Sequence, residues 1–95
     1  MFNEEEINSL ETSVLKSLKA FREERNISQL ELSLISGVSQ NMITYIETGK
    51  RTPSLRTLLK LCNALEISPA KLFENNNSEK EALKKLLIES IQKYL

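Results

Sequence analysis

The sequence predicts an all-α fold, and three observations support this prediction. The 95 residues include only two glycines and two prolines, and aromatic residues make up 5% of the chain. A β-sandwich or barrel needs more turn residues and more aromatic and β-branched runs. Apolar residues recur at steps of three and four, which is the spacing of one face of a helix. Serine or asparagine precedes these segments, as at helix N-caps. This length suits one small domain rather than two.

The composition excludes several classes of function. With no histidine and a single cysteine, Cys62, the chain lacks a disulfide framework and the residues of most zinc sites. Histidine-based acid–base catalysis is excluded as well. No apolar run approaches the ~20 residues of a membrane span, and the acidic N-terminus lacks the basic start of a signal peptide. We therefore expect a soluble, cytoplasmic protein that is not an enzyme and has no cofactor or metal.

The charges sum to zero but are distributed unevenly. Residues 1–14 contain four glutamates and no lysine or arginine, a net charge of −4. Residues 15–73 hold nine basic residues against five glutamates, a net charge of +4, and residues 74–95 hold four of each sign. A local basic surface, rather than the total charge, is what attraction to nucleic acid requires. Charge alone leaves open that these basic side chains only solvate helix faces.

The first predicted helix runs from residue 4 to about residue 25. Asn3 is the expected N-cap, and the glutamates that follow it complement the helix dipole. The apolar stripe of this helix is formed by Ile7, Leu10, Val14, Leu18 and Phe21. Asn26 is expected to end the helix as a left-handed C-cap.

Two short helices are predicted next. Ser28 opens a helix over residues 29–35 with a capping box. A second helix follows over residues 40–48 and is expected to end at Gly49, its C-terminal glycine. Gly37 lies between them and permits the positive φ that lets the second helix leave at a steep angle. The side chains expected to hold the pair together are Leu32, Ile35, Val38, Ile43 and Ile46.

Three further segments complete the chain. A fourth helix begins at Ser54, with a stripe of Leu55, Leu58, Leu59, Cys62 and Leu65. A short fifth helix begins at Ser68-Pro69 and ends at Phe73. After an Asn-rich stretch, a capping box opens a last helix over residues 79–95. Its apolar stripe is formed by Leu83, Leu87, Ile91 and Tyr94, and is broadened by Leu86, Ile88 and Leu95.

The two short helices carry the functional prediction. The second presents uncharged amide, hydroxyl and methyl groups in its first half: Gln40, Asn41, Met42, Thr44 and Tyr45. Amides pair with adenine and apolar atoms meet thymine methyls, so such a surface can read base edges. Lys50, Arg51 and Arg56 follow, where they are well placed for phosphates. The alternatives are plain surface polarity for the two amides and packing against the preceding helix for Tyr45.

The stretch from about residue 15 to residue 73 resembles the phage-repressor type (Xre-like) helix-turn-helix domain. The matching positions are Arg22, Ser28-Gln29, Leu32, Gly37-Val38-Ser39, Ile43, Ile46-Glu47, Gly49-Lys50, Pro53, Leu58 and Leu65. So many positions at the right spacings make a specific match. The resemblance implies a five-helix, lambda-repressor-like domain over residues 15–73. Residues 1–14 would then be an acidic N-terminal extension of its first helix, and residues 74–95 an Asn-rich linker plus an additional C-terminal helix.

The resemblance also implies roles for individual residues. The base contacts would come from Gln40, Asn41, Met42 and Tyr45, with the methionine against a thymine methyl. The phosphate contacts would come from Gln29, Ser39, Thr44, Thr48, Lys50, Arg51 and Arg56. Gln29 would also steady Gln40. Arg22 and Glu47 match an internal ion pair that orients the reading helix rather than contacting DNA.

The sequence departs from the family pattern on the first of the two short helices. Ser33 stands where alanine is usual, which is tolerable if its hydroxyl bonds to the carbonyl four residues earlier. Leu30 and Leu34 stand where polar, solvent-facing residues are usual. Two leucines on an expected outer face suggest a cover, and we expect the N-terminal extension or a partner subunit to provide it.

From these observations we expect a sequence-specific regulator of transcription, associated with the nucleoid. As a repressor or a restriction–modification controller, it would bind an inverted-repeat operator in double-stranded DNA as a homodimer. The C-terminal stripe is the candidate dimer contact, and packing onto its own domain is the alternative. Which terminal helix forms the dimer interface, the N-terminal or the C-terminal one, stays open at this point. Other possibilities are an antitoxin, a regulator controlled by a protein antagonist, and a protein-interaction adaptor that has lost DNA binding.

Overall fold

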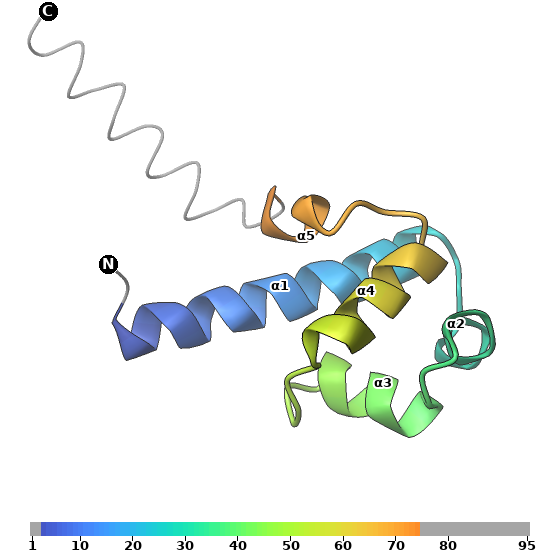
Figure 1. Cartoon of the computed structure of the whole chain (residues 1–95), viewed down its shortest axis with the longest axis horizontal. Coiled ribbons are helices and arrows are strands. Elements are labelled where there is room, and N and C mark those ends of the chain that lie inside the picture. The colour runs from blue at the N-terminus through green and yellow to red at the C-terminus, as the bar shows by residue number, and fades with distance from the viewer. Residues whose placement is uncertain (1–2, 75–95) are drawn as a thin grey trace, which may run out of the picture.

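The computed structural model describes residues 3–74, which form five helices and no strand (Figure 1). In chain order these are α1 (Glu4–Glu24), α2 (Gln29–Ser36), α3 (Gln40–Glu47), α4 (Leu55–Ala64) and α5 (Ala70–Glu74). The prediction of an all-α, five-helix domain is confirmed. The additional helix expected over residues 79–95 lies outside the described residues, and so does its apolar stripe.

Local capping signals set where the helices begin. The N-cap side chains of four helices each accept a hydrogen bond from the backbone N–H three residues on: Asn3, Ser28, Ser39 and Ser54. The capping box of α2 is complete, because Glu31 also accepts a bond from the Ser28 N–H at 3.4 Å. These side chains satisfy amide protons that the first turn of a helix leaves unpaired.

Four helices end at a residue in the left-handed conformation: α2 ends at Gly37, and the other three share one pattern of hydrogen bonds. Asn26 has a φ of 55°, Gly49 of 75° and Glu66 of 56°. In each case the next backbone N–H donates to the carbonyl five residues before it, at distances between 2.8 and 3.1 Å. This pairing is the Schellman motif, which ends a helix by satisfying its last carbonyls. The sequence predicted this ending at Asn26 and Gly49 but not at Glu66, because glutamate is uncommon at positive φ.

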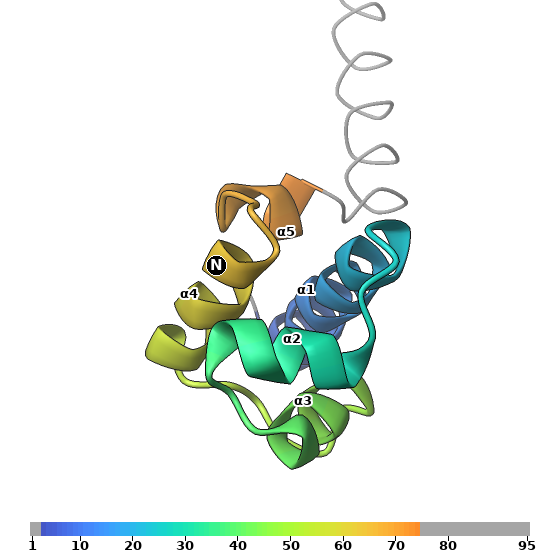
Figure 2. The same cartoon turned by 90° about the vertical axis from the view of Figure 1, so that its right-hand side faces the viewer.

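The core is built from ten buried apolar residues drawn from all five helices and the connections between them. They are Val14, Leu18, Leu32, Val38, Ile43, Ile46, Leu61, Cys62, Leu65 and Leu72. Through these residues α1 packs against α3 and α5, and α2 packs against α3 and α4. Figure 2 shows α2 nearest the viewer, between α3 and α4. Because α3 is held by α1 and α2 together, its position is set from two directions.

Three of the apolar side chains expected inside the fold are exposed instead. Ile35 is 60% exposed, because α2 ends at Ser36 and the chain turns, so that Val38 takes the core position. On α4, Leu55 is 72% and Leu59 44% exposed. The other three residues of the predicted stripe do face the core, because Cys62 and Leu65 are buried and Leu58 packs against them, and Leu61 is the buried residue that the prediction omitted.

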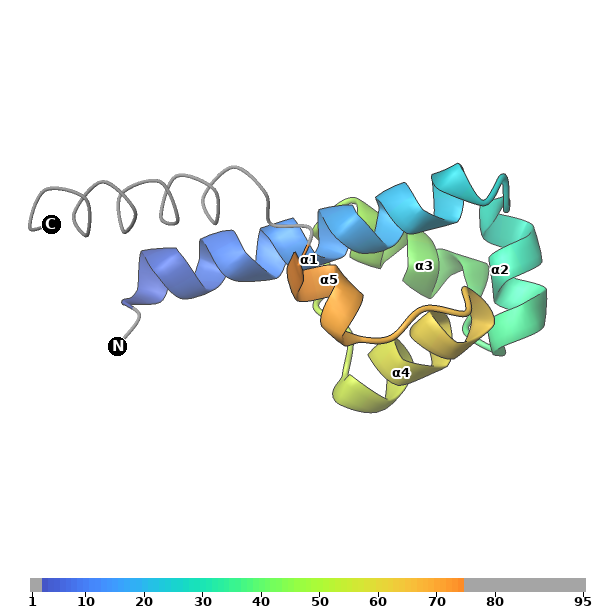
Figure 3. The same ribbon diagram turned by 90° about the horizontal axis from the view of Figure 1, so that it is seen from above.

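The first half of α1 projects beyond the other helices, as the view from above shows (Figure 3). It lies at the end of the molecule opposite α2 (Figures 1 and 3). The prediction that this extension covers Leu30 and Leu34 is therefore wrong, and these side chains are 54% and 76% exposed. A partner subunit as their cover remains a prediction.

Candidate nucleic-acid interface

The connection between α2 and α3 places the first turn of α3 at the surface. Gly37 ends α2 with a φ of 75°, and its N–H donates to the Ser33 carbonyl at 3.0 Å. The Ser36 hydroxyl accepts the Val38 N–H at 3.1 Å, and Ser39 then caps α3. The left-handed glycine lets the two helices cross at a steep angle. In Figure 1, α3 lies along the lower edge of the molecule, on the side away from α5.

An ion pair joins the end of α1 to the end of α3. Arg22 donates from Nε to Glu47 Oε2 at 2.7 Å and from Nη2 to Oε1 at 2.9 Å. Its Nη1 donates to the Ile27 carbonyl at 2.8 Å. The side chains are only 11% and 4% exposed. The hydrogen bonds to Glu47 raise the pKa of the Arg22 guanidinium, against the opposing effect of its burial. The predicted pair is thus present, in the bidentate geometry that fixes orientation as well as distance.

This ion pair extends into a polar network through Gln29. The Gln29 amide donates to Glu47 Oε1 at 2.9 Å, and its oxygen accepts the Thr44 hydroxyl at 3.0 Å. The expectation that Gln29 steadies Gln40 is therefore wrong, because its amide turns toward the second half of α3. Thr44 and Glu47 stand three residues apart on one face of α3, and this spacing is the signal that sequence analysis missed. The network links α1, α2 and α3.

The expected base-reading residues differ in how far they reach the surface. Gln40 and Asn41 are exposed in the first turn of α3. Tyr45 is 38% exposed, and the guanidinium of Arg51 lies 5.4 Å from the centre of its ring, within reach of a cation–π contact. Met42 is half-buried and packs against the core, which leaves only part of its side chain for a thymine methyl.

The expected phosphate-binding residues fall into two groups. Lys50, Arg51 and Arg56 are exposed cations on or beside the turn that follows α3. The hydroxyls of Thr44 and Thr48, by contrast, already donate inside the protein, the latter to the Thr44 carbonyl at 2.7 Å. A hydroxyl has a single proton, so neither threonine can donate to a phosphate without breaking its internal bond.

Three features are absent from the described residues. Across residues 3–74 no three or more Cys, Asp or Glu side chains are grouped so that they could hold a metal ion. No helix in the same range is long and apolar enough to cross a membrane. Within the same range the Ser33 hydroxyl makes no bond to the carbonyl four residues earlier, which was the condition given for tolerating a serine at this position.

A short helix, a glycine turn and a second short helix with an exposed polar first turn define a helix-turn-helix domain. The family comparison gives the same class and makes it specific. The chain belongs to the helix-turn-helix family HTH_3, whose model matches residues 18–72. Relatives that match this chain include HTH-type regulators and repressors of transcription.

Two relatives show how far the similarity extends. An HTH-type transcriptional regulator of Haemophilus influenzae is 48% identical over 63 residues, which cover 64% of this chain and 64% of the relative. The transcriptional repressor RghR of Bacillus subtilis is 45% identical over 53 residues, which cover 55% of this chain and 39% of the repressor. The chain therefore spans less than two thirds of the length of either relative.

Two solved structures share the fold. The restriction–modification controller protein C.AhdI from Aeromonas hydrophila aligns with a TM-score of 0.63 at 33% identity, over 66% of this chain and 96% of the controller. An HTH_3 family transcriptional regulator from Vibrio cholerae aligns with a TM-score of 0.68 at 30% identity, over 73% of this chain and 39% of that regulator. The region in common is the helix-turn-helix domain and its supporting helices.

Proposed function

We propose that this protein regulates transcription by binding an inverted-repeat operator in double-stranded DNA as a homodimer. The observation that carries the proposal is the first turn of α3, where Gln40 and Asn41 are exposed on a helix clamped by the Arg22–Glu47 pair. Amide side chains on a rigid, protruding helix suit the readout of base edges in the major groove. Because this pair holds α3 in place, the side chains of α3 would stay in register with the bases.

In the proposed complex, exposed residues on and beside α3 would contact the bases and the phosphates. α3 would enter the major groove with Gln40 and Asn41 toward the bases, and Tyr45 would contribute one turn further along. The exposed cations Lys50 and Arg51 would hold the phosphate backbone at the end of α3. Ser39 accepts the Met42 N–H and keeps its own hydroxyl proton for a phosphate.

The proposal extends to the assembly and the type of regulator. Two copies related by a two-fold axis would place their reading helices in successive major grooves, about 34 Å apart. The apolar stripe expected over residues 79–95 is the candidate dimer contact. Similarity to a transcriptional repressor and to a restriction–modification controller supports these two types of regulator. The site of action would be the nucleoid, in the cytoplasm.

Selection of bound duplexes from a random DNA pool near physiological salt tests this function. A homodimeric reader is expected to enrich two half-sites related by a two-fold axis, with a fixed spacing between their centres. Binding that shows no preferred sequence and only weakens with added salt would contradict base readout, because phosphate contacts alone behave in that way.

A second candidate function is binding to a protein antagonist, a toxin or another partner through α2. The supporting observation is the exposure of Leu30 and Leu34, at 54% and 76%, on the outer face of that helix. Two matched baits separate this role from DNA binding. A protein partner should be retained by the Gln40→Ala, Tyr45→Ala chain and lost by the Leu30→Ser, Leu34→Ser chain. The opposite pattern would place the partner on α3.

A further inference from the structure

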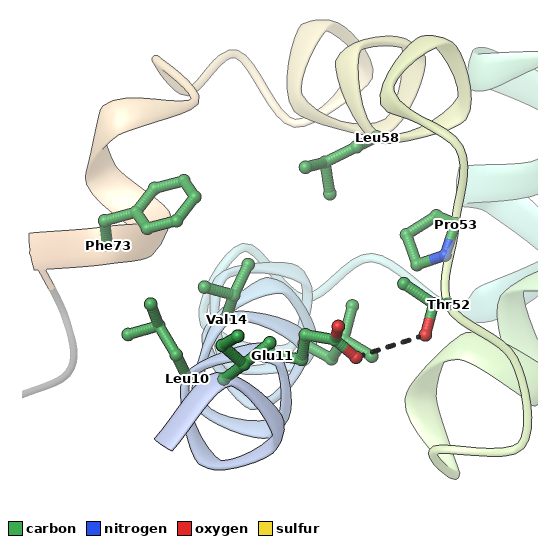
Figure 4. Close-up of a pocket in the computed structure, with 9 residues that line it drawn as sticks. Leu10, Glu11, Val14, Thr52, Pro53, Leu58 and Phe73 are labelled. Atoms are coloured by element: carbon green, nitrogen blue, oxygen red, sulfur yellow. Dashed lines mark hydrogen bonds between the residues drawn. The ribbon is translucent and has the colours of Figure 1, made fainter. Parts of the chain in front are cut away.

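An apolar groove lies at the end of the molecule away from α2. It is enclosed by the first half of α1, the start of α4 with the loop before it, and α5, and its volume is about 220 Å³. Figure 4 shows Leu10, Val14, Leu58 and Phe73 directed toward the same space. The polar side chains of the lining are Glu11 and Thr52, which are joined by a hydrogen bond of 3.4 Å.

The walls of this groove are not fully covered by the described residues. Ile7 is 40% exposed and Phe73 is 50% exposed, although both line the groove. Ile7 and Leu10 both belong to the first half of α1 (Glu4–Glu24). Apolar side chains gathered around a hollow are typical of a surface that another element covers.

The chain itself contains a segment that suits this apolar groove. Residues 79–95 carry a stripe of apolar side chains at helical spacing, whose members are Leu83, Leu87, Ile91 and Tyr94. A helix of this length would measure about 25 Å, enough to follow the projecting half of α1. The segment holds four lysines and three glutamates, a net charge of +1, whereas the first half of α1 holds four glutamates and no basic residue. The net charges of the two elements are therefore opposite in sign, which favours their contact.

The proposed dimer decides which copy supplies this segment. If each chain filled its own groove, stripe and groove would be used up within one copy, and neither would join two copies. If the segments are exchanged, each copy gives one stripe and receives another, which satisfies two-fold symmetry and covers both grooves. Four residues, 75–78, connect α5 to the segment, and the five Cα–Cα steps from residue 74 to residue 79 can span up to about 17 Å when extended.

We infer that the groove between α1, α4 and α5 is the seat for residues 79–95 of a second copy of this chain. This inference rests on the proposed homodimer. The exchanged stripe contacts Ile7, Leu10, Val14, Leu58 and Phe73, and its lysines face the glutamates of α1. The groove includes Thr52 and Pro53, which directly follow the exposed cations Lys50 and Arg51, so docking also supports the loop that carries the phosphate contacts.

Paramagnetic relaxation in mixed dimers tests the inference on the full chain. A nitroxide is attached at Gln92→Cys, off the apolar stripe, in a Cys62→Ala background, and this chain is mixed with ¹⁵N-labelled chain without the nitroxide. We expect the amide signals of Ile7 and Leu10 to lose intensity in the mixture, whereas those of Gln29 stay unchanged. Broadening seen only when nitroxide and ¹⁵N share one chain would show that the segment fills its own groove. Absence of broadening in both samples would show that the groove is not its seat. Either result overturns the inference.

A pair of charge substitutions gives a second readout. Leu10→Glu should raise the dimer dissociation constant about tenfold or more in sedimentation, because each docked copy loses a buried leucine. Leu55→Glu is the matched control, since Leu55 is 72% exposed and lies outside the groove, and it should leave the constant unchanged. Circular dichroism checks that both variants fold. If Leu10→Glu stays as dimeric as the parent while an operator is still selected, the docking fails and the proposed function stands. Broadening across copies without selection of an operator would support the docking and contradict the proposed function.

Discussion

The two ends of α1 are completed in different ways. At its C-terminal end Arg22 makes three hydrogen bonds, two to Glu47 and one to a backbone carbonyl, and both charged side chains are nearly buried. At its N-terminal end Ile7 and Leu10 line a groove that the described residues leave partly open. The same helix therefore anchors the candidate reading helix at one end and presents an apolar surface at the other.

The difference between these ends reflects what each interaction specifies. A bidentate ion pair with a third hydrogen bond fixes both the distance and the orientation of α3, which a reader of base edges requires. Apolar contact is not directional and grows with the area covered, which suits attachment of a further segment or subunit. The predictions below test this contrast, from the largest expected effect to the smallest.

Removal of the Glu47 carboxylate should cause the greatest loss of stability. Glu47→Ala leaves the nearly buried Arg22 charge without its partner, and breaking such a pair costs about 3–5 kcal/mol in the free energy of unfolding. Urea unfolding followed by circular dichroism measures it. Glu23→Ala is the control, because Glu23 is 58% exposed, lies 3.8 Å from the same arginine and should cost less than about 1 kcal/mol. Similar losses in both variants would contradict the anchoring role of the pair.

Two leucines on α2 compare the core with the open surface. Leu32 is 1% exposed and Leu34 is 76% exposed, two residues apart on one helix. Leu32→Ala should lower the free energy of unfolding by about 2–5 kcal/mol, whereas Leu34→Ala should change it by less than about 0.5 kcal/mol. Urea unfolding at several protein concentrations provides the measurement. A large, concentration-dependent loss in Leu34→Ala would show that a second copy covers this surface.

Alanine at position 40 should weaken specific binding without affecting the fold. Gln40 is exposed and forms no part of the Arg22–Glu47–Gln29 network, so Gln40→Ala is expected to leave the unfolding midpoint unchanged. Binding to the selected duplex should weaken by roughly 1–3 kcal/mol, the value of one bidentate contact to a base. Fluorescence anisotropy measures the affinity for labelled duplexes of the selected sequence and of random sequence. An equal loss on random-sequence duplex would mean that the amide does not read a base.

Loss of a phosphate contact should change the salt dependence rather than the sequence preference. Lys50→Ala is expected to reduce the slope of log affinity against log salt by about 1, with equal weakening on specific and random duplexes. Lys71→Ala serves as control, because that lysine is exposed on α5, on the side of the molecule away from α3, and pairs with Glu74 at 3.3 Å. An unchanged slope in the Lys50 variant would remove this residue from the interface.

The smallest expected effect concerns the buried thiol. Burial raises the pKa of Cys62 above its usual value of 9.0, so the folded chain retains a proton that the unfolded chain releases. This contribution to stability is complete below pH 9 and is lost as the pH rises further, by at most about 1.4 kcal/mol per pH unit. Between pH 8 and 10 the free energy of unfolding should therefore fall less steeply with pH for Cys62→Ala than for the parent. Identical slopes would contradict the raised pKa.

Local signals explain which parts of the fold could be predicted from the sequence. Helix starts depend on a side chain that binds an amide three residues away, so Ser28, Ser39 and Ser54 mark them directly. The left-handed ends at Asn26 and Gly49 are equally local. The rotation of α4 depends on which neighbours it meets, and the period of a stripe alone placed Leu55 and Leu59 wrongly.

The candidate site was predicted in part for the same reason. The Arg22–Glu47 pair was expected from the resemblance to the helix-turn-helix family, and the exposure of Gln40 from its place in the first half of the second short helix. The direction taken by the Gln29 amide depends on a competition between partners on α3, which a single sequence does not rank. The apolar groove also escaped prediction, because its walls come from α1, α4 and α5 and meet only in three dimensions.

Parallel selections from a random duplex pool with the parent chain and with Gln40→Ala test the central claim, that the first turn of α3 reads DNA sequence. The parent should enrich two symmetric half-sites. The variant should lose base preference at one position in each half-site, in symmetric places, and keep the same spacing between half-sites. An unchanged preference at every position would contradict the claim, because the exposed amide at the start of α3 would then take no part in recognition.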